Sequence, residues 1–175
     1  KDLVEQIVKM NHGTYLDESL ENSACTDFNI GVAGYPEKHM EAASLEQDIY
    51  HLKKKVEAGA DYIVTQMFFD NQKYYDFVEK CRTSGINVPI IPGLKPITTK
   101  SQLSMIPHRF KVDLPNELVI AIAKAKDNKE VKEIGINWCI QQSKDLMKNG
   151  APVLHYYSMG KSEVVKRIAS EVFKD

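Results

Sequence analysis

The sequence predicts an α/β fold in which four short strands alternate with helices. Apolar runs of strand length occur at 28–33, 62–69, 88–93 and 153–157, and amphipathic helical stretches separate them. Strands separated by helices pair in parallel through right-handed crossovers. Two arrangements fit this order: an open doubly wound sheet, or part of a (β/α)8 barrel. A complete barrel needs eight strands and about 250 residues, so a barrel chain of this length would be one half.

The N-terminal part predicts a helix end, a loop, a strand and a helix, in that order. Residues 1–27 begin with helical apolar spacing and continue as a polar loop, and the first strand follows at 28–33. Ser44 and Gln47 form a capping-box pattern that opens the next helix. Gly59 is expected to end that helix at its C′ position.

The remaining elements follow from the same signals. The continuous apolar run 62–69 indicates a strand buried on both faces. Asp70 is expected to cap the next helix, which Gly85 ends. A strand at 88–93 follows, and after it come three helices: one near 99–105, one that begins with Pro115 at position N1, and one over 128–149. The last two elements are a strand at 153–157 and a helix over 161–173.

Composition describes an ordinary globular chain of 175 residues, and we expect a single partial domain over 1–175. The net charge of −1 gives no general affinity for nucleic acid or for a membrane surface. No apolar run approaches the roughly 18–20 residues that span a bilayer. Cys25, Cys81 and Cys139 lack metal-ligand spacing, so we expect reduced thiols in a cytoplasmic protein and no metal site.

Polar residues collect where the predicted strands end. Because ligands bind at the carboxyl ends of parallel strands in both candidate architectures, one rim is the expected site. The residues that converge there are Tyr35, Glu37 and His39 after the first strand, Thr65 and Gln66 within the second, Lys95 and Thr98 after the third, and Tyr157, Ser158 and Lys161 after the fourth.

Gln66 and a polar strip on the helix after the first strand each have a structural and a functional interpretation. Gln66 lies inside an apolar strand, where its amide either bonds to neighbouring backbone or presents a donor and an acceptor to a heterocyclic ligand. A polar strip on the helix after the first strand is either a solvated face or a contact surface for a ribose and a pyrophosphate. The strip contains Asp48, His51, Lys54 and Lys55.

Four segments together resemble the methylenetetrahydrofolate reductase family. They are "GVAGYPEKHMEA", "DIYHLKKKVEAGADYIVTQMFFD", "IIPGLKPIT" and "LHYYSMGKSE", in this order from residue 31 onwards. The resemblance implies the C-terminal half of a (β/α)8 TIM barrel over 28–175, holding about the fifth to eighth strands. It also implies FAD as cofactor, in a cytoplasmic oxidoreductase of one-carbon metabolism and methionine biosynthesis. NAD(P)H would reduce the flavin, which reduces 5,10-methylenetetrahydrofolate to 5-methyltetrahydrofolate.

The resemblance also assigns roles to individual residues. Ile106 stands where some members carry an aromatic that stacks on the nicotinamide, and Lys161 replaces an arginine. The residues expected to bind the cofactor are Tyr35, His39, Asp48, His51, Lys54 and Lys55. The residues expected to bind substrate are Gln66, Gln102, Tyr157 and Lys161.

The family's general-acid glutamate and its acidic residue near the flavin belong to segments outside this sequence. We therefore expect no catalytic residue in this chain and no turnover by it alone, and we expect a homo-oligomer. The alternative is a non-catalytic half-barrel that acts by self-association or by pairing with the missing half, through its uncovered sheet edges. An unrelated phosphate-binding barrel enzyme such as an aldolase is disfavoured, because Lys95 follows its strand too late to act within it.

Overall fold

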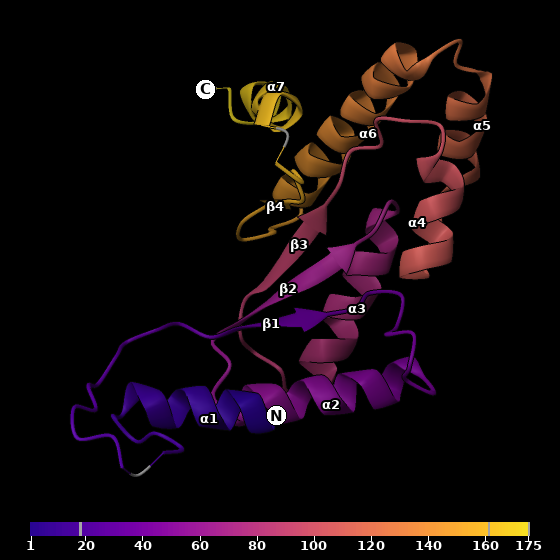
Figure 1. The fold of residues 1–175 in the computed structure, drawn as a ribbon. Helices are drawn as coiled ribbons and strands as arrows, with labels where there is room; N and C mark the ends of the chain where they lie inside the picture. Colours follow the sequence, from indigo (N-terminus) through magenta and orange to yellow (C-terminus); the bar gives the residue numbers. More distant parts are fainter. Residues whose placement is uncertain (18, 161, 175) are drawn as a thin grey trace.

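The chain folds around one parallel sheet of four strands in the order β1-β2-β3-β4 (Figure 1). The computed structural model describes residues 1–17, 19–160 and 162–174. The strands are β1 (Gly31–Gly34), β2 (Tyr62–Met67), β3 (Ile90–Leu94) and β4 (His155–Tyr156). The helices are α1 (Asp2–Asn11), α2 (Leu45–Glu57), α3 (Asn71–Thr83), α4 (Gln102–Phe110), α5 (Asn116–Lys124), α6 (Asn128–Lys148) and α7 (Ser162–Val172).

The sequential strand order decides between the two architectures that the sequence allows. A doubly wound sheet reverses its strand order at a switch point, whereas neighbours along a barrel follow the chain. Here each strand pairs in parallel with the next one, from Gly31 opposite Tyr62 to Gly93 opposite His155. The fold is therefore the C-terminal half of a (β/α)8 barrel, as the sequence predicts.

The caps of α2 form as the sequence predicts. The Ser44 hydroxyl accepts a hydrogen bond from the Gln47 backbone N–H, 3.2 Å away, and the Gln47 side chain accepts one from the Ala43 N–H. Gly59 follows the helix with φ of +111°, a backbone conformation that favours glycine. Local capping chemistry thus fixes where the chain leaves β1 and where it returns to the sheet.

Some predicted boundaries differ from the structure. Asp70 caps α3 as expected, by accepting from the Gln72 N–H at 2.9 Å. Pro115 occupies the N-cap of α5 with an extended ψ of 138°, so its expected place at N1 is wrong by one residue. The strand predicted at 153–157 shortens to the two residues of β4, because pairing with β3 involves only His155 and Tyr156.

Two large apolar clusters hold the described part of the fold together, and a third, small one contains Val4, Ile30 and Ala60. The larger packs the outer face of the sheet against the helices and includes Ile63, Phe77, Leu94 and Ile136, each almost fully buried. The smaller lies among α4, α5 and α6 and includes Ile106, which is fully buried. In the described part of the chain, no helix combines the length and hydrophobicity needed to cross a membrane.

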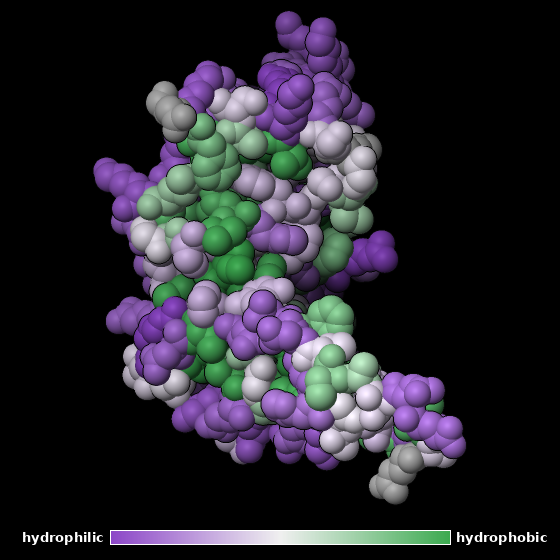
Figure 2. Space-filling view, turned by 90° about the vertical axis from the view of Figure 1, so that its left-hand side faces the viewer, coloured by the Kyte–Doolittle hydropathy of each residue, from purple (hydrophilic) through white to green (hydrophobic). Residues whose placement is uncertain are grey.

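The expectation that the second strand is buried on both faces is wrong. Ile63 and Thr65 are fully buried, whereas Tyr62, Val64 and Gln66 alternate with them and remain half-exposed. The half-exposed residues lie on the inner face of the sheet, which the other strands of a closed barrel would cover. Apolar side chains also gather visibly on one face of the molecule in Figure 2.

Replacing Gly135 in α6 by alanine should destabilise the fold. The α6 backbone passes so close to Ile97 that a Cβ at position 135 would overlap the Ile97 carbonyl oxygen. We expect the free energy of unfolding to decrease by about 2–3 kcal/mol, since backbone on both sides limits relaxation. Urea denaturation followed by circular dichroism measures the effect. Asn137→Ala on the exposed side of the same helix is the control, and equal effects of the two variants would contradict the close approach.

Candidate functional site

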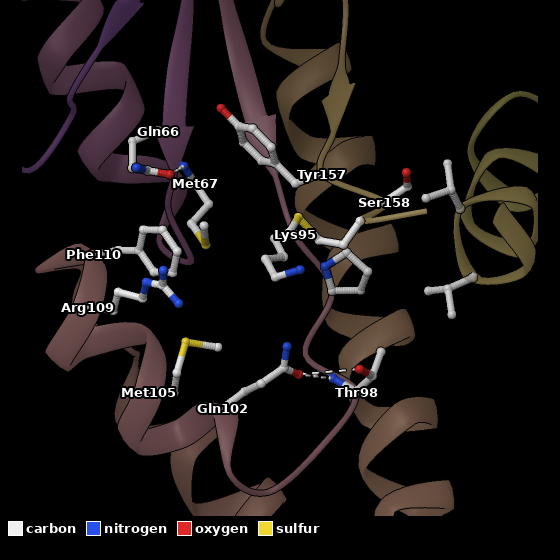
Figure 3. A pocket seen from close by; sticks show the side chains of 14 residues that line it. Gln66, Met67, Lys95, Thr98, Gln102, Met105, Arg109, Phe110, Tyr157 and Ser158 are labelled. Carbon is white, nitrogen blue, oxygen red and sulfur yellow. Dashed lines mark hydrogen bonds between the residues drawn. The ribbon is translucent and has the colours of Figure 1, made fainter. Parts of the chain in front are cut away.

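A cavity of about 490 Å³ opens where β2, β3 and β4 end, with α4 as its opposite wall (Figure 3). It brings together residues that the sequence places after three different strands. Its polar lining residues are Gln66, Lys95, Thr98, Gln102, Arg109, Tyr157 and Ser158. Three of the substrate-binding residues implied by the resemblance therefore share one cavity: Gln66, Gln102 and Tyr157. The fourth, Lys161, lies outside the described residues.

The Gln66 amide is satisfied in part by neighbouring backbone, as its structural interpretation predicts. Its carbonyl oxygen accepts a hydrogen bond from the adjacent Met67 N–H at 3.0 Å, which satisfies part of the amide locally. Its amide nitrogen donates to no residue in the described part of the chain, although the side chain lines the cavity. The Gln66 amide nitrogen therefore remains available as an N–H donor beside the cavity.

Tyr156 of β4 and Tyr157, which follows it, point to opposite sides of the sheet. The Tyr156 hydroxyl bonds to Ser143 of α6 at 2.8 Å, and burial raises the pKa of Tyr156 to about 12. The Tyr157 ring turns into the cavity, and its hydroxyl donates to the Thr65 carbonyl oxygen at 2.8 Å. Tyr157 is thus a wall held in place by β2, and burial also raises its pKa.

Gln102 has a structural role as well as a place in the cavity. Its carbonyl oxygen accepts hydrogen bonds from the backbone N–H groups of Thr98 and Thr99, at 2.6 and 3.1 Å. These bonds fix the loop that enters α4. Its amide nitrogen turns into the cavity in Figure 3, so Gln102 also offers a donor whose position is set by the loop.

Helix α4 supplies cavity residues that the sequence argument missed. Met105, Arg109 and Phe110 line the cavity, whereas Ile106 is fully buried in the smaller apolar cluster. Helical spacing could have identified Met105 and Arg109, since positions 105 and 109 fall on the same helix face as Gln102. Together with Lys95, Arg109 gives this cavity two cations, and the described residues that line it include no carboxylate.

A second cavity of about 300 Å³ lies between the loop after β1 and helix α2. It gathers five of the six residues expected to bind the cofactor: Tyr35, His39, Asp48, His51 and Lys55. The Asp48 carboxylate accepts the His39 backbone N–H at 2.8 Å, and the Tyr35 and His39 rings meet edge-on at 4.6 Å between centroids. Burial, with a smaller effect of Asp48, raises the pKa of Tyr35.

Lys54, the sixth expected cofactor residue, does not line this cavity. Its ammonium group lies 4.8 Å from the centroid of the Tyr50 ring, as in a cation–π contact. The predicted polar strip of α2 therefore divides into a part that faces the cavity and a part that lies on the surface. The cavity still combines two imidazoles, a lysine and two carboxylates, Asp48 and Glu41. The carboxylates suit ribose hydroxyls, and the imidazoles and the lysine suit phosphate oxygens.

The loop after β1 is held by its own side chains. Lys38 has a positive φ of +76°, and its ammonium group donates to the carbonyl oxygens of His39 and Ala42, at 3.2 and 2.5 Å. These bonds stabilise a backbone conformation that is otherwise unfavourable for lysine. Lys38 thereby shapes the wall that carries Tyr35 and His39.

Neither thiols nor a metal centre add chemistry to the described residues. Cys81 and Cys139 are buried and unpaired, and burial raises the pKa of each thiol to about 12. Cys25 is exposed and also unpaired. No group of three or more potential metal ligands occurs in the parts of the chain described.

Comparison with known proteins gives several relatives of one kind. Methylenetetrahydrofolate reductase 1 of Schizosaccharomyces pombe is 38% identical over 143 residues, covering 81% of this chain and 24% of the relative. Methylenetetrahydrofolate reductase (NADH) 1 of Arabidopsis thaliana is 40% identical over 142 residues, covering 75% and 24%. The 5,10-methylenetetrahydrofolate reductase of Salmonella typhimurium is 34% identical over 139 residues, covering 79% and 47%. The chain thus spans between a quarter and a half of the length of these relatives.

A solved structure supports the fold. It is an uncharacterized protein from Clostridium thermocellum that binds two copies of 5-methyl-5,6,7,8-tetrahydrofolic acid, with a TM-score of 0.58 and 20% identity. The match covers 83% of this chain and 52% of the other, as expected when half of a barrel aligns with a larger chain. The family model for methylenetetrahydrofolate reductase matches residues 2–172. The chain therefore belongs to the methylenetetrahydrofolate reductase family.

Proposed function

We propose that this chain is the C-terminal half of an FAD-dependent reductase that converts 5,10-methylenetetrahydrofolate to 5-methyltetrahydrofolate with NAD(P)H. Membership of the family supports the reaction class. The observation that carries the proposal is the pair of cavities at the carboxyl ends of the strands, one lined by Gln66 and Tyr157 and one by Tyr35 and His39. A flavin reductase needs one site for its cofactor and one for the molecules that exchange hydride with it.

The larger cavity suits the substrates. The Gln66 N–H can bond to an acceptor on a pterin or a nicotinamide, and apolar walls such as Met105 and Phe110 can pack against the ring. Lys95 and Arg109 can meet a carboxylate of a folate or a phosphate of a dinucleotide. Because both ligands would use the same walls, NAD(P)H and the folate would bind in turn.

The smaller cavity suits one portion of FAD. Asp48 can accept from ribose hydroxyls beside its bond to the His39 N–H, and His51 and Lys55 can meet phosphate oxygens. The bound flavin would accept a hydride from NAD(P)H and pass it on. The described residues bind and orient these groups, and we assign none of them as proton donor. We propose that the acid–base groups belong to the other barrel half, so that this chain alone is inactive.

A second candidate function is a non-catalytic half-barrel that associates with another copy or with a separate partner half. The edges of the four-stranded sheet favour it, since β1 and β4 each pair with one neighbour in the described chain. Exposed apolar side chains favour it too: Leu3, Phe28, Val153 and Phe173 are each more than half exposed. Sizing of the purified chain, with and without FAD, separates a stable homo-oligomer from a monomer.

Competition between ligands tests the proposed function. The material is the extended protein, meaning this chain together with the other barrel half that the proposal assigns to the enzyme. NADH and 5-methyltetrahydrofolate are titrated separately and then together, with calorimetry as the readout. We expect each to exclude the other, because both require the Gln66 cavity. Simultaneous binding, or binding of neither ligand, would contradict the proposal.

Substituting the two neighbouring lysines of α2 should affect cofactor binding differently. Lys55 lines the smaller cavity, whereas Lys54 lies over the Tyr50 ring. We expect Lys55→Ala to weaken FAD binding by the extended protein about tenfold, the effect of losing one charge-assisted hydrogen bond. Lys54→Ala, the matched control, should change it less than twofold. Flavin fluorescence titration measures both, and an equal loss in the two variants would argue against the assignment of this cavity.

A further inference from the structure

The Glu37 side chain joins two loops that the sheet does not bring together. Glu37 follows β1, and its carboxyl oxygen accepts a hydrogen bond from the Asp113 backbone N–H at 3.0 Å. Asp113 belongs to the connection between α4 and α5, which follows β3. Since β1 pairs with β2 and β2 pairs with β3, this bond links the first βα unit directly to the third.

The bond acts at the end of α4, where the chain changes direction. Pro107 interrupts the helical bonding within α4, and Lys111 adopts a left-handed conformation with φ of +55°. Val112 is then 3% exposed and packs into the smaller apolar cluster. The Asp113 N–H comes only three residues after Phe110, which lines the larger cavity beside Arg109. A hydrogen bond that fixes Asp113 therefore also fixes the cavity wall formed by Arg109 and Phe110.

We propose that Glu37 is a positioning residue that fixes the end of α4, with Arg109 and Phe110, against the loop that carries Tyr35 and His39. The consequence is that the walls of the two cavities are set relative to one another by a single side chain. What the cavities bind rests on the proposed function, whereas the contact itself does not. Glu37 acts through the α4 end and is not assigned a contact with substrate or cofactor.

The surroundings of Glu37 favour its protonated form. Burial is the main cause, and it raises the pKa of Glu37 from an ordinary 4.5 to about 7. The Asp113 N–H lowers the pKa of Glu37, the Asp113 carboxylate raises it, and Lys73 lowers it. Lys73 also approaches the Asp113 carboxylate at 3.8 Å. Because the folded chain binds this proton more tightly than the unfolded chain, the stability from Glu37 decreases as pH rises from about 4.5 to about 7.

Hydrogen–deuterium exchange of the extended protein tests the positioning role without any ligand. We expect amides 110–114 to exchange about tenfold faster in Glu37→Ala, the effect of losing one partly buried hydrogen bond. Glu37→Gln keeps the acceptor oxygen and should retain the slow exchange. Between pH 6 and 8, after correction for intrinsic rates, the wild type should lose protection at these amides, because burial disfavours the ionised carboxylate more than the Asp113 N–H favours it. Glu37→Gln should keep its protection over the same range. Glu79→Ala, which removes an exposed carboxylate on α3, is the control.

A ligand measurement connects the contact to the cavity. In the extended protein at pH 6, Glu37→Ala should raise the Kd for 5-methyltetrahydrofolate several-fold, and Glu37→Gln should retain the wild-type value. Unchanged exchange at 110–114 in Glu37→Ala, or a Glu37→Gln variant that behaves like Glu37→Ala, would overturn the proposal. A wild type that binds no folate would count against the proposed function instead, and the exchange result would still decide the role of Glu37.

Discussion

Replacing Gly93 by alanine is expected to destabilise the sheet by about 3 kcal/mol, the upper end of the usual cost of overpacking. A Cβ at this position would overlap the Thr65 carbonyl oxygen and press on the Tyr157 ring. The Gly93 N–H also donates to the Thr65 hydroxyl at 2.9 Å, and the Tyr157 hydroxyl donates to the same Thr65 carbonyl. One added methyl group therefore disturbs the β2–β3 pairing and the cavity wall together.

Gly150→Ala is the matched control for this variant. Gly150 has a positive φ of +83° but no atom within 4 Å of an added Cβ. Its replacement carries only the conformational cost of a left-handed alanine, about 1 kcal/mol. Urea unfolding of both variants, followed by circular dichroism, measures the difference. A loss at Gly93 no larger than that at Gly150 would show that the strands separate easily and that Tyr157 is not held as described.

Replacing Gln66 is expected to produce the largest loss of ligand binding. Gln66→Leu removes the N–H donor from the cavity and leaves the polar edge of a bound ring without its partner, which should raise the Kd about 30-fold. Gln66→Glu keeps the oxygen that accepts the Met67 N–H but cannot donate when ionised. It should therefore also bind poorly, although the local bond to the Met67 N–H is kept.

Calorimetry of 5-methyltetrahydrofolate binding by the extended protein measures these effects. Gln141→Leu replaces an exposed glutamine on α6 and should leave the affinity unchanged. If Gln66→Glu bound as well as the wild type, the amide donor would have no role, and the assignment of the larger cavity would be contradicted.

Local sequence chemistry predicted much of the fold. Ser44, Asp70 and Gly59 each lie where their capping role requires, because a cap depends on only a few neighbouring residues. The half-exposed inner face of β2 was not predictable in this way. An apolar strand such as 62–69 looks the same in sequence whether or not other strands cover its second face, so its burial cannot be predicted from the strand alone.

The site shows the same division between local and long-range information. Helical spacing placed Asp48, His51 and Lys55 on one face, but it could not separate Lys55 from Lys54, since Tyr50 decides the position of the Lys54 ammonium group. Glu37 had no predicted role, because its partner lies 76 residues away in the chain. Contacts of this kind depend on the three-dimensional arrangement of distant loops and leave no local signal in the sequence.

The flavin content and turnover of two purified samples show whether this chain supplies only part of the flavin site and lacks activity alone. One sample is this chain alone, and the other is the extended protein, each incubated with FAD, freed of unbound flavin and assayed for NAD(P)H–menadione reduction. We expect a yellow, active extended protein and a colourless, inactive chain, since Tyr35, His39 and Lys55 would supply only one part of the flavin site. Turnover by the chain alone, or an extended protein that retains no flavin, would contradict it.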